Sequence, residues 1–196
     1  MIKVLLLDVD GVIVNARRFS ETLEKDYGLT EEDTLLFFKG KFLDCLIGKA
    51  DLYEELLPHL KEWGWAKSVD EFVEYWFTSE HKIDEQLMDY VGELRKKGIK
   101  CYIVTNQEKY RTEYLLSEMN FDTLFDGIFS SAHIGFRKPR EDFFLYVLRR
   151  LKGIKRDEIV LWDNTPEHIE SARQLGIHAE LYKGFDTFRE KMKNYP

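Results

Sequence analysis

The fold is decided by residues 2–14, which read IKVLLLDVDGVIV. The run from Ile2 to Leu7 is apolar except for one lysine, and a run of this kind, soon followed by a glycine, is typical of a strand buried in a parallel sheet. Asp8 and Asp10 follow at its carboxyl end, where burying a charge is costly unless a cation or a reaction requires it. Because ligands of open α/β sheets bind outside the carboxyl ends of the strands, we predict that these two acids belong to an active site.

The rest of the chain shows two patterns. Residues 16–81 have only helical periodicity, with capping residues such as Thr30 and Ser68 at the expected helix starts. After them, short apolar runs alternate with helical segments, at residues 99–104, 127–130, 158–162 and 178–181. The sequence therefore predicts an α/β fold, a doubly wound, Rossmann-like parallel sheet formed by residues 1–15 and 82–196, with residues 16–81 inserted as an all-helical domain.

Composition excludes several classes of partner. The 196 residues carry 29 Lys and Arg against 36 Asp and Glu, a formal net charge of −7, and no basic stripe suits the phosphates of a nucleic acid. The amino terminus lacks the features of a signal peptide, and no apolar run reaches membrane-spanning length. Cys45 and Cys101 show no pairing pattern, as expected in a reducing compartment. We expect a cytoplasmic monomer or homodimer that binds a small molecule, and neither nucleic acid nor membrane.

Polar residues follow the buried strands of the predicted sheet. Thr105 and Asn106 come after the second strand, Lys138 after the third, and Asp163 and Asn164 after the fourth. Since the carboxyl ends of parallel strands meet at one edge, these side chains should gather with the two acids of the first strand. A carboxylate can attack phosphorus, another can move protons, and hard oxygen ligands select Mg²⁺. Lysine and threonine can spread the charge of a transferring phosphoryl group, so this set of residues suits phosphoryl transfer.

Four segments resemble, in order, the motifs of the haloacid dehalogenase superfamily of phosphohydrolases. They are LLLDVDGV (residues 5–12), IVTN (103–106), GFRKP (135–139) and VLWDN (160–164). The helical block stands where one subgroup of this family carries a helical cap, directly after the first motif. The resemblance implies a Mg²⁺-dependent phosphatase that hydrolyses a small phosphorylated metabolite through an aspartyl-phosphate intermediate.

The resemblance also implies roles for single residues. It makes Asp8 the nucleophile and a Mg²⁺ ligand, and it makes Asp10 the general acid and base, with its backbone carbonyl on the metal. It places Thr105 and the backbone of Asn106 on the phosphoryl oxygens, and it pairs Lys138 with the nucleophile and the phosphoryl group. The resemblance also argues against dehalogenase chemistry, because the dehalogenase members of the family lack the acid that this chain has at position 10.

The fourth motif departs from the family pattern. The resemblance makes Asp163 a metal ligand, but many relatives have a second acid where this chain has Asn164, and others have it where this chain has Glu167. Asn164 can still bind the metal or a metal-bound water through its carbonyl, with weaker Mg²⁺ binding than an acid gives. Glu167 is expected to be an acid in the first turn of a helix. The histidines show no ligand spacing, and we expect no catalytic role for any of them: His59, His81, His133, His168 and His178.

Three functions remain open at this point. The first is the phosphatase, and the second is a phosphomutase that returns the phosphoryl group to a sugar phosphate. The third is a non-catalytic binding or regulatory protein with the same fold, for which Asn164 is the only support. In the helical block, we expect the aromatic residues to form a core rather than a cofactor site, and the basic residues to be solvated surface: Trp63, Trp65, Tyr75, Trp76 and Phe77, and Arg17, Arg18, Lys41 and Lys49.

Overall fold

A five-stranded parallel sheet lies at the centre of the protein. The structure is a computed structural model, and it describes residues 1–195. The strand order is β3-β2-β1-β4-β5, so β1 is the middle strand. The strands are β1(Val4–Leu7), β2(Lys100–Thr105), β3(Gly127–Ser130), β4(Ile159–Asp163) and β5(His178–Leu181). Leu7 is level with Ile103 of β2 and Trp162 of β4, so the residues after these strands leave the sheet at one edge. The predicted α/β fold is confirmed.

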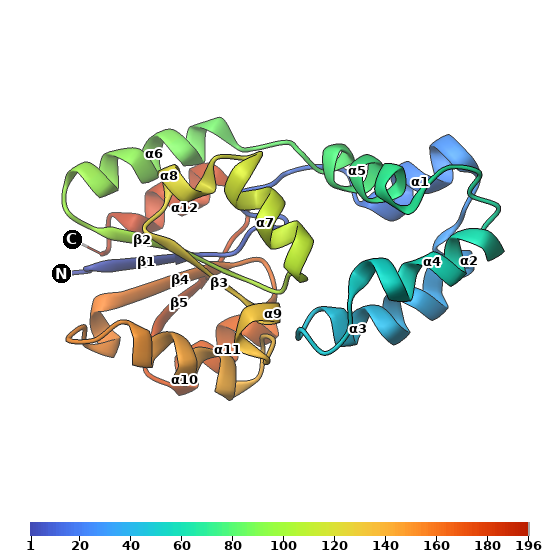
Figure 1. The fold of residues 1–196 in the computed structure, drawn as a ribbon. Helices are drawn as coiled ribbons and strands as arrows, with labels where there is room; N and C mark the ends of the chain where they lie inside the picture. The colour runs from blue at the N-terminus through green and yellow to red at the C-terminus, as the bar shows by residue number, and fades with distance from the viewer. Residues whose placement is uncertain (196) are drawn as a thin grey trace.

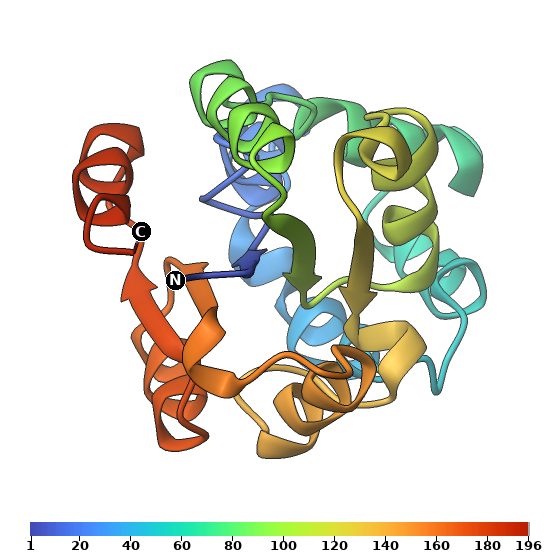
Figure 2. The ribbon, with the colours of Figure 1, turned by 90° about the vertical axis from the view of Figure 1, so that its left-hand side faces the viewer.

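Helices cover both faces of the sheet (Figure 1). Leu5 and Leu7 pack in one core, beneath α6(Glu85–Lys96), α7(Lys109–Ser117), α8(Phe121–Leu124) and α12(Phe185–Met192). Val4 and Leu6 pack in the other, against α9(Ser131–Ile134), α10(Glu141–Arg150) and α11(Pro166–Gln174). Figure 2 shows the two helical layers on either side of the sheet. Because both faces of β1 are buried, its sequence is continuously apolar rather than alternating.

A helical insertion stands between β1 and β2, beyond the carboxyl ends of the strands (Figure 1). It contains α1(Phe19–Tyr27), α2(Glu31–Leu36), the irregular turn η1(Phe37–Lys41), α3(Phe42–Cys45), α4(Leu52–Glu62) and α5(Val69–Ser79). Thr30 and Ser68 form the predicted capping boxes at the starts of α2 and α5. The aromatic residues singled out in the sequence pack in the core of this insertion, as predicted.

The chain leaves the core for the insertion and returns to the core at the same place. Val14 forms an antiparallel bridge with Ile83, the Asn15 N–H donates to the Lys82 carbonyl at 2.9 Å, and the Asp84 N–H donates to the Ile13 carbonyl at 2.9 Å. The two connecting segments therefore run side by side. This pairing supports the proposed division at residues 15 and 82, which stays a prediction.

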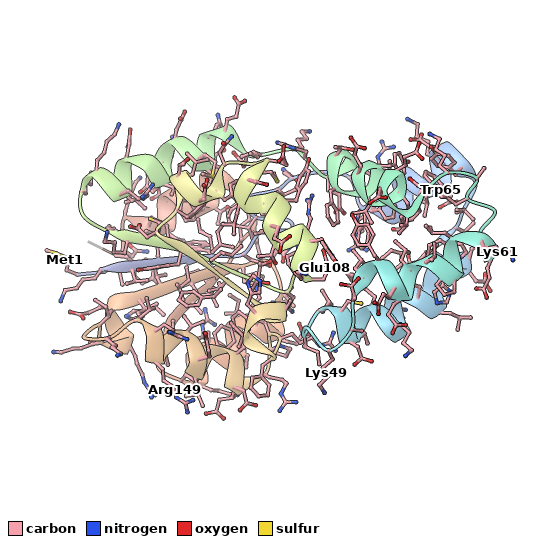
Figure 3. The ribbon with its side chains drawn as sticks, in the orientation of Figure 1. Met1, Lys49, Lys61, Trp65, Glu108 and Arg149 are labelled. Carbon is pink, nitrogen blue, oxygen red and sulfur yellow. The ribbon has the colours of Figure 1, made fainter. Side chains whose placement is uncertain are left out.

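A second contact holds the far side of the insertion against the core. A Cβ on Gly48 would lie 2.4 Å from the Ala132 carbonyl oxygen of α9, so the two backbones meet closely. The Tyr110 hydroxyl of α7 donates to Asp51 Oδ2 at 2.6 Å. Figure 3 shows Lys49 in this loop, next to α9. The insertion is thus attached to the core on both sides of the strand ends.

In the described part of the chain, four short elements are not predicted from the sequence: α8, α9, η1 and the 3₁₀ turn η2(Arg156–Glu158). Each spans three to five residues, which is too short for helical periodicity to be seen. No helix in residues 1–195 has the length and apolar character needed to cross a membrane.

Candidate active site

A buried lysine joins two buried aspartates at the carboxyl edge of the sheet. The Lys138 Nζ lies 2.9 Å from Asp8 Oδ1 and 2.5 Å from Asp163 Oδ2, and it donates to the Val104 carbonyl at 2.8 Å. All three donors of the ammonium therefore have partners, although Lys138 is only 1% exposed. Burial disfavours the charge of Lys138, but Asp8 and Asp163 outweigh burial and raise its pKa above the ordinary value. The strand ends thus meet in a buried row of three charged groups.

The two aspartates of this row differ in acidity. Burial raises the pKa of Asp8 to about 6; Lys138 opposes this rise, while Asp163 and Asp10 add to it. Burial acts on Asp163 too, but there Lys138 and His168 outweigh it and lower the pKa to about 2. At neutral pH the row therefore holds two carboxylates and one ammonium. The negative charge in excess favours a further cation at this place.

Asn106 and Thr105 lie beside the row. The Asn106 side chain donates from Nδ2 to the Lys138 carbonyl at 2.9 Å and accepts from the Lys138 N–H at 2.8 Å, so it fixes the backbone of the lysine. The Thr105 hydroxyl is buried and has no hydrogen-bond partner among the described residues. A buried donor without an acceptor is unfavourable by about 1–3 kcal/mol. A phosphoryl oxygen bound here would accept this hydrogen bond.

Asp10 faces a cavity of about 280 Å³ between the core and the insertion. Gln107 Nε2 donates to Asp10 Oδ2 at 2.5 Å, and this contact orients the carboxyl group. Desolvation by the protein around it raises the pKa of Asp10 to about 6, although its side chain is partly open to the cavity; Glu80 adds to the rise and Arg111 opposes it. A carboxyl group with this pKa can give and take a proton near neutrality.

Asn164 contacts the backbone of the first motif. Its Nδ2 donates to the Asp10 carbonyl at 3.0 Å, the same carbonyl that the family resemblance assigns to a metal. Gly11 has a φ of +77°, and a Cβ there would lie 2.0 Å from Asn164 Nδ2. The positive φ therefore favours glycine at position 11, and a larger residue there would also displace the Asn164 amide from its present position.

His168 lies next to the charged row, although its spacing in the sequence does not indicate this. Its Nδ1 is 3.0 Å from both carboxylate oxygens of Asp163. Ligand atoms of Asp8, Asp163 and His168 lie within 4.8 Å of one another, which makes these three a candidate metal group. The helix α11 brings His168 back over the end of β4, whereas Glu167 is an exposed acid in the first turn, as expected.

Glu108 is a buried acid at the end of the core that faces the insertion (Figure 3). It caps α7 by accepting from the N–H groups of Tyr110, at 2.8 Å, and Arg111. Burial raises the pKa of Glu108 to about 7, against the effect of these two hydrogen bonds. Neither Glu108 nor Gln107 is indicated by the sequence, because their positions depend on how α7 leaves the sheet.

The acidity of Glu108 predicts a pH dependence of stability. Between pH about 4.5 and 7 the folded protein keeps this proton while the unfolded chain loses it, so the free energy of unfolding falls as the pH rises, by about 3 kcal/mol. Glu108→Gln keeps one of the two acceptor oxygens but cannot ionise, and it should remove this share of the pH dependence. Urea unfolding at the two ends of this range measures the effect, with Glu113→Gln on the exposed side of α7 as control. An unchanged pH dependence in Glu108→Gln would contradict the prediction.

The sheet order, the helical insertion after the first strand and the acids at the end of β1 define a Rossmann-like α/β fold with an inserted helical cap. The sequence profile described as haloacid dehalogenase-like hydrolase matches residues 5–181, and the chain belongs to this family.

Curated relatives include phosphatases. The putative pyrophosphatase PpaX of Caldanaerobacter subterraneus subsp. tengcongensis is 26% identical over 99% of this chain and 89% of its own length. A glyceraldehyde 3-phosphate phosphatase of Methanocaldococcus jannaschii is 31% identical over 47% of this chain and 41% of its own length. A drimenol cyclase of Aspergillus calidoustus is 31% identical over 58% of this chain, but the match spans only 22% of that protein.

Solved structures share the fold. A predicted HAD-like family hydrolase of Porphyromonas gingivalis superimposes with a TM-score of 0.81 and 23% identity, over 98% of each chain. A HAD family enzyme of Bacteroides thetaiotaomicron, in complex with magnesium and inorganic phosphate, superimposes with a TM-score of 0.79 and 23% identity, over 93% of this chain and 95% of that one.

Proposed function

We propose that the protein is a Mg²⁺-dependent phosphatase that hydrolyses the phosphate monoester of a small molecule through an aspartyl phosphate on Asp8. The observation that carries this proposal is the Asp8–Lys138–Asp163 row beside the unpartnered Thr105 hydroxyl. The phosphatases among the relatives and the phosphate in the Bacteroides enzyme support it. In this proposal, each site residue predicted from the sequence takes part in one reaction.

In the first step Asp8 attacks phosphorus and the bond to the ester oxygen breaks. Asp10, held by Gln107, gives its proton to the departing oxygen, so the alcohol leaves neutral. Lys138 and Thr105 stabilise the charge that spreads over the phosphoryl oxygens, together with the backbone N–H of residue 106. In the second step Asp10 takes a proton from water, and the hydroxide attacks the phosphorus of the acyl phosphate, which releases phosphate and restores the Asp8 carboxylate.

The residues present fit Mg²⁺. Asp8 and Asp163 offer hard oxygen ligands, and their two charges exceed the single charge of Lys138. Asp8, Asp163 and the Asp10 carbonyl would hold the ion, and Asn164 could add its side-chain oxygen after releasing its present hydrogen bond to that carbonyl. When bound, Mg²⁺ supplies charge neutralisation between the attacking carboxylate and the anionic phosphoryl group.

Phosphate release tests the proposal. Protein with Mg²⁺ is incubated with p-nitrophenyl phosphate, acetyl phosphate and a panel of phosphorylated metabolites, and inorganic phosphate is measured. Accumulation of phosphate is the expected result. An isomerised sugar phosphate without phosphate release would favour the phosphomutase. Absence of turnover, together with absence of a fluoroberyllate adduct on Asp8, would favour the non-catalytic protein.

A further inference from the structure

The cavity that Asp10 faces has one wall from the core and one from the insertion. Asp10, Asn106 and Gln107 line the core side, next to the proposed phosphoryl site. The insertion contributes an apolar set to the opposite wall: Phe19, Leu35, Phe38, Phe42, Leu46 and Trp76. The alcohol part of a phosphate ester held at the strand ends would therefore enter this space.

The aromatic rings of the insertion wall pack against one another. Phe19 stacks on Trp76 with ring centres 5.1 Å apart and an interplanar angle of 19°. Phe38 meets Trp76 edge-on at 5.3 Å, and Phe42 lies tilted against Trp76 at 5.4 Å. Gly40 departs from helical backbone angles within η1, the turn that supplies Phe38. The wall is thus a preformed set of ring faces and edges.

Several polar groups of the insertion wall already form hydrogen bonds within the protein. The Trp76 indole N–H donates to Glu80 Oε2 at 3.2 Å, and Glu80 Oε1 accepts from the Phe19 N–H at 3.2 Å. The Thr34 hydroxyl donates to the Thr30 carbonyl at 3.3 Å. Ser20 offers a half-buried hydroxyl, and the remaining charged groups of the insertion wall are on exposed residues: Arg18, Glu31 and Lys39. On the core side, the buried Arg111 of α7 also lines the cavity; its Nη1 donates to the Phe77 carbonyl at 2.8 Å, and its Nε and Nη2 have no hydrogen-bond partner among the described residues.

We propose that the alcohol released by this protein is apolar and carries a flat ring, so that the preferred substrates are arylalkyl phosphates rather than sugar or polyol phosphates. Sugar hydroxyls buried against the rings of the insertion wall would lose water and gain few partners there, because the Trp76, Glu80 and Thr34 groups of that wall are already hydrogen-bonded. A flat apolar group instead gains from burial and from ring contacts. The cavity volume of about 280 Å³ restricts the ligand to a small ring system. This inference rests on the proposed function, since it assumes that the phosphoryl group sits at the strand ends.

Ligand binding tests the inference without turnover. Asp8→Asn protein with Mg²⁺ is titrated by calorimetry with benzyl phosphate and with glucose 6-phosphate, which are both esters of primary alcohols. Benzyl phosphate should bind at least about tenfold more tightly. Equal binding, tighter binding of the sugar phosphate, or no binding of either would overturn the inference. Phosphate release by the unmodified protein is assayed separately, so that failure of the proposed function can be distinguished from failure of this preference.

Two neighbouring leucines provide matched variants. Leu35 lines the cavity, whereas Leu36 is 80% exposed and does not line it. In the Asp8→Asn protein, Leu35→Asn should weaken benzyl phosphate binding about tenfold, and Leu36→Asn should leave it unchanged. Thermal melting of both variants checks that they are folded. Equal effects of the two substitutions would show that Leu35 does not line the binding site. If Leu35→Asn does not fold, the comparison of benzyl phosphate with glucose 6-phosphate decides the inference.

Discussion

Replacing Asp8 by asparagine should abolish phosphate release and leave the fold intact. An amide cannot form an acyl phosphate, so the rate should fall by a factor of about ten thousand or more. The fold should survive because asparagine has the shape of aspartate, and because Lys138 keeps its contacts with Asp163 and the Val104 carbonyl. Burial already disfavours the charge of Asp8, so removing that charge also removes an unfavourable contribution.

Two measurements check this prediction. Hydrolysis of p-nitrophenyl phosphate with Mg²⁺ gives the rate, and circular dichroism with thermal melting gives the state of the fold. Asp122→Asn, on an exposed position of α8, is the matched control and should keep the full rate. Hydrolysis at the unmodified rate by Asp8→Asn would rule out Asp8 as the nucleophile.

Replacing Lys138 by methionine should damage both stability and activity. The substitution leaves Asp8 and Asp163 facing each other in the protein interior without the cation that pairs with both. Removing one member of a buried ion pair lowers the free energy of unfolding by about 3–5 kcal/mol, because the remaining charges are uncompensated. Phosphate release should also be lost, since the lysine no longer stabilises the transferring phosphoryl group.

Denaturant unfolding measures the stability of Lys138→Met. Lys152→Met, at an exposed position, is the control and should change the free energy of unfolding by less than about 0.5 kcal/mol. The loss in Lys138→Met should shrink at acid pH, where Asp8 takes up a proton. A variant as stable as the unmodified protein at neutral pH would show that the lysine does not compensate the two aspartates.

The sheet could be predicted from the sequence because its strands are buried on both faces. The central strand reads as an unbroken apolar run, and the predicted strands at residues 127–130 and 178–181 coincide with β3 and β5. Once the strands are parallel, the residues after them must meet at one edge. This is why the sequence alone predicts that Asp8, Lys138 and Asp163 lie together.

Other parts of the site depend on orientations that periodicity does not reveal. His168 reaches Asp163 only because of the angle at which α11 leaves β4. The Asn106 side chain holds the backbone of Lys138, a contact between two loops that the sequence does not indicate. Of the residues that line the cavity wall, the sequence predicts only Trp76 as core, and which residues of the insertion face the site depends on how the insertion docks. The roles of the site residues and the exact division at residues 15 and 82 stay predictions.

The paired segments that connect the core to the insertion have a consequence for how such proteins diversify. The chain leaves the core after Val14 and returns at Ile83, and these two residues are bridged to each other. An exchange of the whole insertion at this point would leave the path of every strand unchanged. Under the proposed function, the cavity wall can therefore change without displacing the strand ends that hold Asp8 and Asp163, so replacing a single continuous segment would fit the same core to a different alcohol.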